Sequence, residues 1–160
     1  MTQENYYLTK KGLEDIKKEY EDLKNLRSAK TKGEVPKIWE SEDLNPEYLC
    51  FQEDLNLLET RLVELENILK KVKLIKIPSK KNQNVVELGA KVFVEIDGEI
   101  DEFKIVGTLE ADPSEKRISN ESPIGKCLMG RKIGETVVVR IPAKSPIVNH
   151  SCKIKKIKYI

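Results

Sequence analysis

Seven acidic side chains, with no lysine or arginine among them, fall between residues 38 and 60. Carboxylates gathered at one end of a rigid element are hard oxygen ligands that suit Mg²⁺. Packed like charges also repel one another unless a cation or a cationic partner lies close to them. The cluster therefore predicts a metal-dependent site or, as the simpler alternative, a solvated polar turn. Its members are Glu40, Glu42, Asp43, Glu47, Glu53, Asp54 and Glu59.

The preceding stretch, residues 9–37, has the opposite charge, with nine lysines and arginines against six acids. Basic side chains along one element can attract a phosphate backbone, although a solvated face is the simpler interpretation. No aromatic-rich platform accompanies them, so we expect no surface that recognises a nucleotide sequence. The formal net charge of the whole chain is only +2 and does not by itself indicate a nucleic-acid binder.

Motifs of a self-sufficient enzyme are absent from the sequence. There is no Walker loop, GxGxxG, GxSxG or metal-binding histidine pair. The single histidine, His150, is expected on the surface of a late strand. Cys50, Cys127 and Cys152 are far apart and lack CxxC spacing, which predicts free thiols in a cytosolic protein. The N-terminus has no apolar signal core and no stretch is apolar enough to span a membrane, so we expect a cytoplasmic protein.

A long helix must position the acidic cluster, because residues 46–73 carry an unbroken heptad pattern. Pro46 suits the first turn of this helix and Asn45 can cap it. One narrow apolar stripe on so long a helix predicts a single long partner helix. The stripe consists of Tyr48, Phe51, Leu55, Leu58, Leu62, Leu65, Leu69 and Val72.

The partner helix is expected within residues 9–42, where Thr9 can cap its start. The short connection at residues 42–45 predicts an antiparallel hairpin. Gly33 and Pro36 predict a kink or break, followed by a distal helical piece that reaches about Glu42. The apolar stripe of this first helix consists of Leu13, Ile16, Tyr20, Leu23 and Leu26.

The second half of the chain predicts a small β-rich domain. Alternating runs at residues 91–96 and 102–106 flank Asp97-Gly98, a hairpin turn signal. Residues 136–141 and 152–160 predict two further strands. We therefore expect an antiparallel sheet.

One short helix is expected between these strands. Ser122 can cap it, Pro123 fits its first position and Gly130 can end it. The fold class is thus α+β, with a coiled-coil domain at residues 1–76, a linker at 77–84 and a second domain at 85–160.

Several short blocks of residues along the chain are specific in type and spacing. The Glu-Ala-Asp block at 110–112 and the Ser-Pro-Ile-Gly block at 122–125 are the most specific. The others are Tyr7-Leu8-Thr9 with Gly12-Leu13, Asp43-Leu44, Asn45-Pro46-Glu47-Tyr48, Ile105-Val106-Gly107, Pro113, Ile118-Ser119, Leu128-Met129-Gly130 and Lys132-Ile133-Gly134. Over nearly the whole chain they resemble the bacterial Gre family of transcript cleavage and elongation factors.

The resemblance implies an antiparallel coiled-coil hairpin followed by an FKBP-like antiparallel β-sheet domain with one short helix and no isomerase role. In such factors the second domain docks at the rim of the RNA polymerase secondary channel, and the coiled coil enters the channel. We expect docking through Ser122, Pro123 and Ile124. The partners expected are RNA polymerase and the 3′ end of backtracked RNA, without a membrane, and the protein is expected to be a monomer. The basic side chains expected to face this RNA are Lys17, Lys24, Arg27 and Lys30.

For the acidic tip, the resemblance implies that Asp43, with Glu47 or Glu42, helps to hold a Mg²⁺ ion shared with RNA polymerase. Two-metal chemistry in the polymerase then cleaves the RNA, so the factor stimulates an active site and is not itself an enzyme. Because Asp43 and Glu47 would bind the ion only together with polymerase ligands, we expect no metal on the isolated protein.

The tip departs from the family pattern, which reads Asp-Leu-x-Glu-Asn-Ala-Glu-Tyr. Here the turn is two residues shorter, and Pro46 stands where the second tip glutamate is usual. Glu47 or Glu42 could take the place of that glutamate. Alternatively, the chain is a channel-binding regulator or inhibitor that lacks cleavage stimulation. A coiled-coil adaptor without any link to polymerase is a third interpretation.

Overall fold

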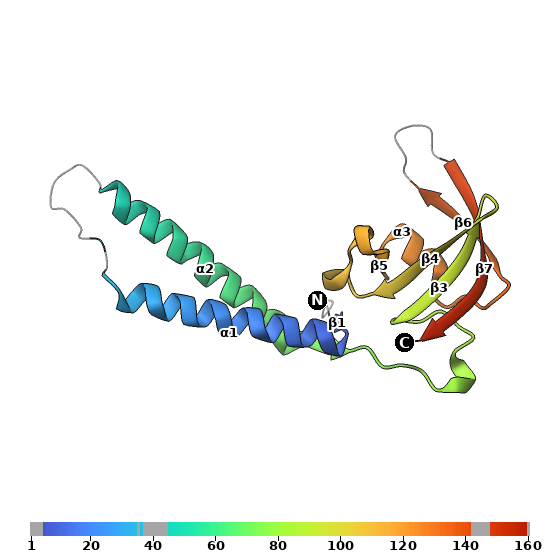
Figure 1. Ribbon diagram of the computed structural model, residues 1–160, viewed down its shortest axis with the longest axis horizontal. Helices are drawn as coiled ribbons and strands as arrows, with labels where there is room; N and C mark the ends of the chain where they lie inside the picture. Colours follow the sequence, from blue (N-terminus) through green and yellow to red (C-terminus); the bar gives the residue numbers. More distant parts are fainter. Residues whose placement is uncertain (1–4, 35, 37–44, 142–147, 160) are drawn as a thin grey trace. The chain divides into compact units, whose positions relative to one another are not determined.

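The structure is a computed structural model that describes residues 5–34, 36, 45–141 and 148–159 (Figure 1). The chain forms two compact units. The helical unit is Lys11–Val72, and the β unit combines Met1–Lys10 with Lys73–Ile160. Residues 5–10 and 73–76, which the sequence analysis assigned to the coiled-coil domain, therefore lie in the β unit. Among the described residues no helix is both long and apolar enough to cross a membrane.

The helical unit consists of α1 (Lys10–Lys32) and α2 (Pro46–Lys71), as predicted. Two ion pairs join them, Glu19 with Arg61 at 2.8 Å and Lys30 with Asp54 at 2.7 Å. The earlier residue of α1 pairs with the later residue of α2, so the helices run antiparallel. Helix α2 begins as the sequence predicts, because the Asn45 side chain accepts a hydrogen bond from the Glu47 amide at 3.0 Å and Pro46 occupies the first turn.

The predicted break in the first helix is confirmed. Helix α1 ends at Lys32, the Gly33 amide closes its last turn on the Ala29 carbonyl at 3.1 Å, and Pro36 is not helical. The proposed distal helical piece lies almost wholly outside the described residues.

The apolar stripe of α2 is buried mainly in its second half, at Leu58, Leu62, Leu65 and Ile68. Ile68, which was not assigned to the stripe, is buried, whereas Leu69 is only half-buried. Ile68 lies three residues after Leu65, so burial follows a three-residue step here in place of the predicted four-residue step. The remaining predicted members, Tyr48, Phe51, Leu55 and Val72, are half-buried.

On α1 the assignment of Leu26 to the stripe was wrong, since that side chain is 47% exposed. The 3-4 spacing that continues from Leu23 falls on Arg27 and Lys30 instead. The apolar stripe of α1 therefore ends at Leu23, and beyond it the facing positions of α1 are polar.

The β unit contains a five-stranded sheet in the order β5-β4-β3-β7-β6. Its strands are β3 (Ala90–Ile96), β4 (Glu99–Val106), β5 (Arg117–Ser119), β6 (Thr136–Ile141) and β7 (Val148–Tyr159). All neighbouring pairs are antiparallel except β4–β5, which is parallel and includes a strand that the alternation did not reveal.

The β3–β4 hairpin turns at Asp97-Gly98, as predicted. Both residues have positive φ, 52° and 87°, which is the conformation of the type I′ turn that matches strand twist.

The short helix α3 (Pro123–Leu128) packs over one face of the sheet and contributes Leu128 to its core. The opposite face of the sheet carries the alternating polar residues. Three short 3₁₀ turns also belong to this unit. They are η1 (Lys80–Asn82, inside the predicted linker), η2 (Thr108–Glu110) and η3 (Pro113–Glu115).

The N-terminal strand β1 (Tyr6–Leu8) pairs with β2 (Val72–Leu74) in a separate two-stranded sheet. The Ile75 amide also donates to the Leu8 carbonyl at 2.8 Å. A Cβ atom at Gly107 would lie 1.9 Å from the Tyr7 carbonyl oxygen, so only glycine permits this close approach. These contacts explain why the residues before α1 belong to the β unit.

Replacing Leu65 by alanine should lower the free energy of unfolding of the helical unit by about 2–5 kcal/mol, because its side chain is fully buried in the stripe. Leu57, 71% exposed on the same helix, is the matched control, and its replacement by alanine should change stability by less than about 0.5 kcal/mol. Urea unfolding followed by far-ultraviolet circular dichroism measures both. Equal losses in the two variants would contradict the buried stripe.

Candidate functional site

The acidic cluster adjoins the start of α2. Glu42 and Asp43 lie outside the described residues. Glu47 lies in the first turn of α2 with its side chain exposed, and it forms no ion pair with any described residue. A carboxylate is favoured there by the positive end of the helix dipole. In the described part of the chain no three carboxylate, histidine or thiol groups gather as metal ligands.

Two tip positions serve the helix start. The Asn45 side chain caps α2 and Pro46 forms its first position, and neither residue has a carboxylate. The shortened turn thus leaves Glu47 as the first acidic side chain of α2.

The four basic residues predicted to face RNA differ in their surroundings. Lys17 and Lys24 are exposed on α1. Lys24 and Arg27 line a hollow of about 210 Å³ between the helices, together with Tyr20 and residues of α2. Lys30 is half-buried and bound to Asp54 of α2. Lys30 therefore has a partner within the hairpin, although an exposed pair of this kind contributes only about 0–1 kcal/mol.

The predicted docking residues Ser122, Pro123 and Ile124 lie together at the start of α3, but they differ in role. The Ser122 hydroxyl accepts a hydrogen bond from the Gly125 amide at 3.0 Å and donates one to the Ser119 carbonyl at 2.7 Å. Ser122 is thus a helix cap, as the simpler interpretation holds. Pro123 is exposed and Ile124 is half-buried.

Pro123 and Ile124 border an open, mainly apolar hollow of about 410 Å³. The sequence analysis did not include several residues in its wall. Ala111, Pro113 and Ile118 could have been found from the specific blocks, whereas nothing in the strand alternation marked Phe103. The lining residues are Phe103, Ala111, Pro113, Lys116, Arg117, Ile118, Ser119, Ser122, Pro123 and Ile124.

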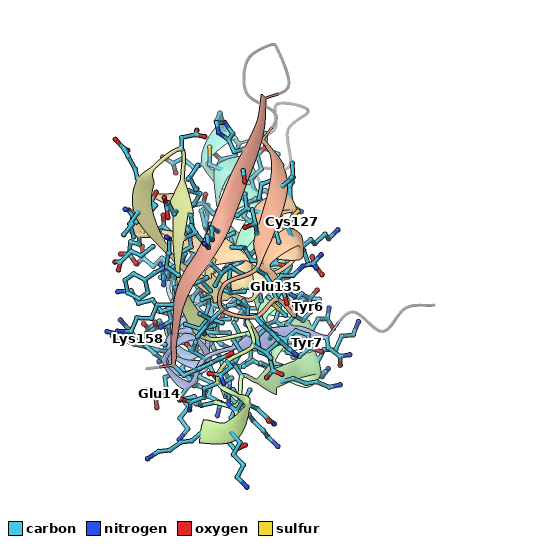
Figure 2. All side chains as sticks on the ribbon, turned by 90° about the vertical axis from the view of Figure 1, so that its right-hand side faces the viewer. Tyr6, Tyr7, Glu14, Cys127, Glu135 and Lys158 are labelled. Carbon is cyan, nitrogen blue, oxygen red and sulfur yellow. The ribbon has the colours of Figure 1, made fainter. Side chains whose placement is uncertain are left out.

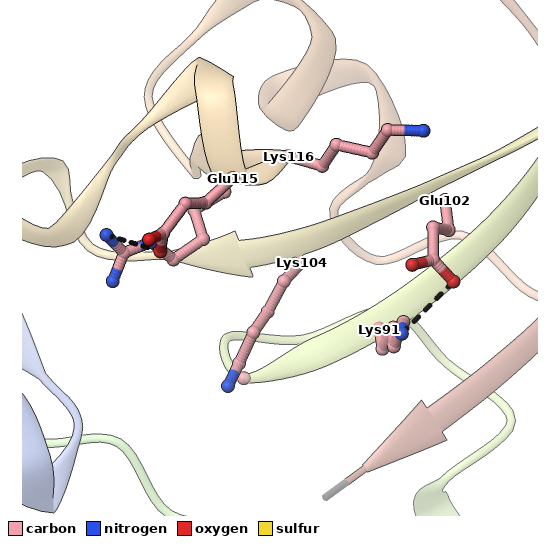
Figure 3. A pocket seen from close by; sticks show the side chains of 7 residues that line it. Lys91, Glu102, Lys104, Glu115 and Lys116 are labelled. Atoms are coloured by element: carbon pink, nitrogen blue, oxygen red, sulfur yellow. Dashed lines mark ion pairs between the residues drawn. The ribbon is translucent and has the colours of Figure 1, made fainter.

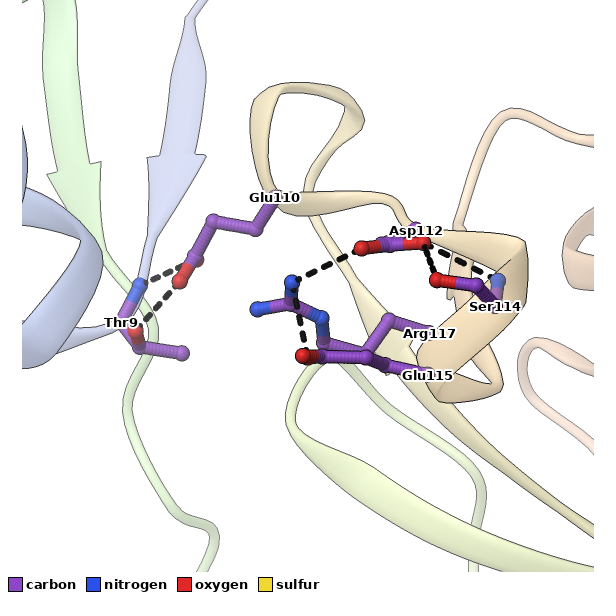
Figure 4. Close-up of polar contacts among 6 residues, drawn as sticks. All are labelled: Thr9, Glu110, Asp112, Ser114, Glu115 and Arg117. Atoms are coloured by element: carbon purple, nitrogen blue, oxygen red, sulfur yellow. Dashed lines mark hydrogen bonds and ion pairs between the residues drawn. The ribbon is translucent and has the colours of Figure 1, made fainter.

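A polar network holds the loop that forms one wall of this hollow (Figure 4). One oxygen of Asp112 accepts hydrogen bonds from the Ser114 hydroxyl at 2.5 Å and the Ser114 amide at 3.0 Å. The bond from the Ser114 hydroxyl is the main cause that lowers the pKa of Asp112 below its ordinary value. Arg117 reaches Glu115 at 3.0 Å and Asp112 at 3.6 Å. The wall is therefore fixed before any partner binds.

Glu110 ties the N-terminal segment to the same loop. Its two carboxylate oxygens accept hydrogen bonds from the Thr9 hydroxyl at 2.6 Å and from the Thr9 amide at 2.7 Å (Figure 4). Each residue of the Glu-Ala-Asp block thus has a distinct place: Glu110 holds the residue before α1, Ala111 lines the hollow and Asp112 holds the loop.

The cysteines and the histidine take no part in these sites. All three thiols are free, as predicted, and Cys152 is buried, which raises its pKa. His150 lies on β7 and its Nδ1 is 2.8 Å from a carboxylate oxygen of Asp97 at the hairpin turn.

Comparison with known proteins shows the family of the chain. The description "Transcription elongation factor, GreA/GreB, C-term" matches residues 80–159, and "Transcription elongation factor, N-terminal" matches residues 6–74. Transcription elongation factor GreA of Thermomicrobium roseum is 40% identical over 144 residues, with 89% of this chain and 92% of the relative covered. The GreA of Clostridium acetobutylicum is 39% identical over 148 residues, with the same coverage.

Among solved structures, the GreA factor homolog 1 (Gfh1) protein of Thermus thermophilus is 24% identical, with 97% of this chain and 99% of that chain covered and a TM-score of 0.42. The two matching halves and the GreA relatives define the class as a transcription factor that acts during elongation. The chain belongs to the GreA/GreB family of transcription elongation factors, which confirms the resemblance found in the sequence.

Replacing Glu110 by alanine should lower the free energy of unfolding of the β unit by about 2 kcal/mol, because two hydrogen bonds to a charged acceptor are lost. Glu121 is a suitable control, since its carboxylate is exposed and accepts one longer bond, 3.1 Å from the Thr108 hydroxyl. Its replacement by alanine should cost less than about 0.5 kcal/mol. Calorimetric unfolding of both variants measures the difference, and an unchanged Glu110 variant would show that the Thr9 contact is dispensable.

Proposed function

We propose that this elongation factor enters the secondary channel of RNA polymerase and stimulates cleavage of backtracked RNA by the polymerase's own active site. Family membership supports a role in elongation. The observation that carries the finer proposal is the antiparallel hairpin: α1 and α2 run in opposite directions, and the segment that joins them holds Glu40, Glu42 and Asp43. Helix α2 alone is about 39 Å long, enough to carry acids far from a docking unit.

In this proposal Asp43 and Glu47, with Glu42 as the alternative partner, would hold a Mg²⁺ ion jointly with the polymerase. Their hard carboxylate oxygens suit this ion, and Glu47 forms no ion pair with a described residue. When bound, the ion would help to activate the attacking water and stabilise the leaving oxygen. Two carboxylates bind Mg²⁺ weakly, so the isolated protein is expected to carry no metal. The factor is therefore a stimulator rather than an enzyme.

The apolar hollow of the β unit would receive the rim of the polymerase channel. Its wall is held by Asp112 and Arg117, and Pro123 and Ile124 present apolar surface at its edge. An apolar, largely preformed surface loses little conformational entropy on binding, which favours stable docking.

The basic side chains of α1 would lie near the RNA 3′ segment. Lys17 and Lys24 are exposed and have no ion pair with a described residue, so they are the better candidates for phosphate contact. Arg27 lies between the helices, and Lys30 must first leave Asp54. The monomeric state and the cytoplasmic location remain predictions.

The shortened tip favours a second candidate function, that of a channel-binding regulator or inhibitor. The usual second tip glutamate is missing, and the residues at positions 45 and 46 are committed to capping and starting α2. If Glu47 does not replace the missing glutamate, the factor would occupy the channel without supporting cleavage.

A cleavage assay on a stalled, backtracked polymerase complex tests the tip. Asp43→Ala should retain polymerase binding and reduce cleavage by about 100-fold or more, since a lost metal ligand removes several kcal/mol of transition-state stabilisation. Glu47→Ala should do the same if Glu47 is the second ligand. Glu53→Ala, which removes an exposed acid further along α2, is the control and should retain activity.

Binding without any cleavage by the unaltered protein would replace the main proposal with the inhibitory one. Absence of polymerase binding would contradict both and favour an adaptor.

Replacing Pro123 by aspartate tests the docking surface. An acid in the first turn of a helix is tolerated, so the melting temperature should stay nearly unchanged. An unpaired charge in an apolar interface should weaken polymerase binding by about tenfold or more. Ser79→Asp, which adds the same charge at an exposed helix start outside the hollow, should bind normally. Loss of folding in Pro123→Asp would instead assign the residue a purely structural role.

A further inference from the structure

Four basic side chains form one row across the sheet of the β unit. Arg117 of β5 pairs in register with Lys104 of β4, Lys104 pairs with Lys91 of β3, and Lys91 pairs with Lys158 of β7. Residues directly opposite one another on neighbouring strands project from the same face. Strands lie about 4.8 Å apart, so the row spans about 14 Å across four strands. We call these four residues the cationic row.

The cationic row lies on the face of the sheet opposite α3. Its neighbours along β3, Val92 and Val94, are buried on the α3 side, whereas Lys91 and Phe93 point the other way. Figure 2 labels Lys158 near the end of β7. This face meets the apolar hollow assigned to polymerase docking at Arg117, which lines both surfaces.

Like charges placed directly opposite one another destabilise a sheet. Carboxylates offset the charge of two members: Glu102 pairs with Lys91 at 3.0 Å, and Arg117 pairs with Glu115 at 3.0 Å and Asp112 at 3.6 Å. Lys104 and Lys158 form no ion pair with any residue that the structure describes. The row is therefore an arrangement that the fold does not need and that an anion would stabilise.

A β-bulge adds further positive charge beside the row. The register between β3 and β7 shifts after Phe93, which faces Lys156, while Val94 faces Ile154. Lys155 is the extra residue and forms an ion pair with Glu95, whereas Lys156 is exposed and forms no ion pair with a described residue. Bulges of this kind redirect side chains, and here two consecutive lysines lie away from the core.

Phe93 organises two members of the row. The ammonium groups of Lys91 and Lys158 lie 5.7 and 5.6 Å from the centre of its ring. Cation–π attraction at these distances holds both lysines over the ring. Because the lysines cover the ring, the face offers charge rather than an open aromatic surface on which bases could stack.

A hollow of about 260 Å³ adjoins the other end of the row (Figure 3). Lys91, Lys104 and Arg117 contribute cations to its lining, against the carboxylates of Glu102 and Glu115. Lys116 also lines the hollow, but its ammonium group is paired with Asp101 at 2.5 Å. The Nε atom of Arg117 is buried and donates to no acceptor in the described part of the chain. An anionic oxygen is the kind of group that such a site accepts.

We propose that the cationic row binds the phosphate backbone of a single nucleic-acid strand, without preference for its sequence. A nucleic-acid strand carries one negative charge per nucleotide at regular intervals, so its phosphates can follow a linear row of cations. The compact acidic patch of a protein partner would fit such a row less well. The contact needs neither polymerase nor the acidic tip, so the isolated protein is sufficient to test it.

The test measures binding of a short oligouridine RNA to the full chain by fluorescence anisotropy at several salt concentrations. The double variant Lys104→Gln with Lys158→Gln should bind about tenfold more weakly, and the slope of log affinity against log salt should fall by about 0.7 per lost contact. Its melting temperature should be equal or higher, because like charges have been removed. Glu102→Gln, which frees Lys91, should bind more tightly.

The matched control removes two charges elsewhere in the β unit. Lys80→Gln with Lys81→Gln, both exposed in η1, should change affinity by less than about twofold. Equal losses in the two double variants would overturn the proposal in favour of bulk charge. Preference for phosphatidylserine vesicles over RNA would overturn the proposal in favour of a lipid surface. Vesicles are included because Ile100 and Val138, on the same face of the sheet, are exposed apolar side chains that could contact lipid.

Discussion

The hairpin depends on burying one apolar stripe along α2 against α1. Leu58, Leu62, Leu65 and Ile68 are buried there, and this burial is the main favourable term that keeps two long helices paired. Charge alone could not do so, because the cross-helix ion pairs are exposed and contribute little. The acidic segment between the helices is useful only if this pairing makes the hairpin rigid enough to present it.

The apolar stripe is confined to the part of α1 before Arg27. Beyond Leu23 the facing positions are polar, and Leu26 is exposed. The hairpin is therefore stabilised furthest from its acidic segment and least stabilised near it.

In the β unit, the Glu-Ala-Asp block joins structure and proposed function. Glu110 holds Thr9 just before α1, while Asp112 and Arg117 fix the wall of the apolar hollow. The two faces of the sheet then carry different properties, with the α3 side apolar and the opposite side cationic. The two proposed binding surfaces thus use different faces of one small sheet and meet at Arg117.

The sequence alone determined the two helices, the cap of α2, the β3–β4 hairpin, the α3 helix and the family, because each depends on local spacing, turn residues or short specific blocks. It identified Ser122 as a helix cap and Pro123 and Ile124 as surface residues beside it, but not Phe103. Only the tertiary structure decided that Ile68 replaces Leu69, that residues 5–10 belong to the β unit and that Arg117, Lys104, Lys91 and Lys158 align. Those features depend on which side chains the packed neighbours cover, on the close approach at Gly107 and on strand register, none of which is fixed by residues that are neighbours in the chain.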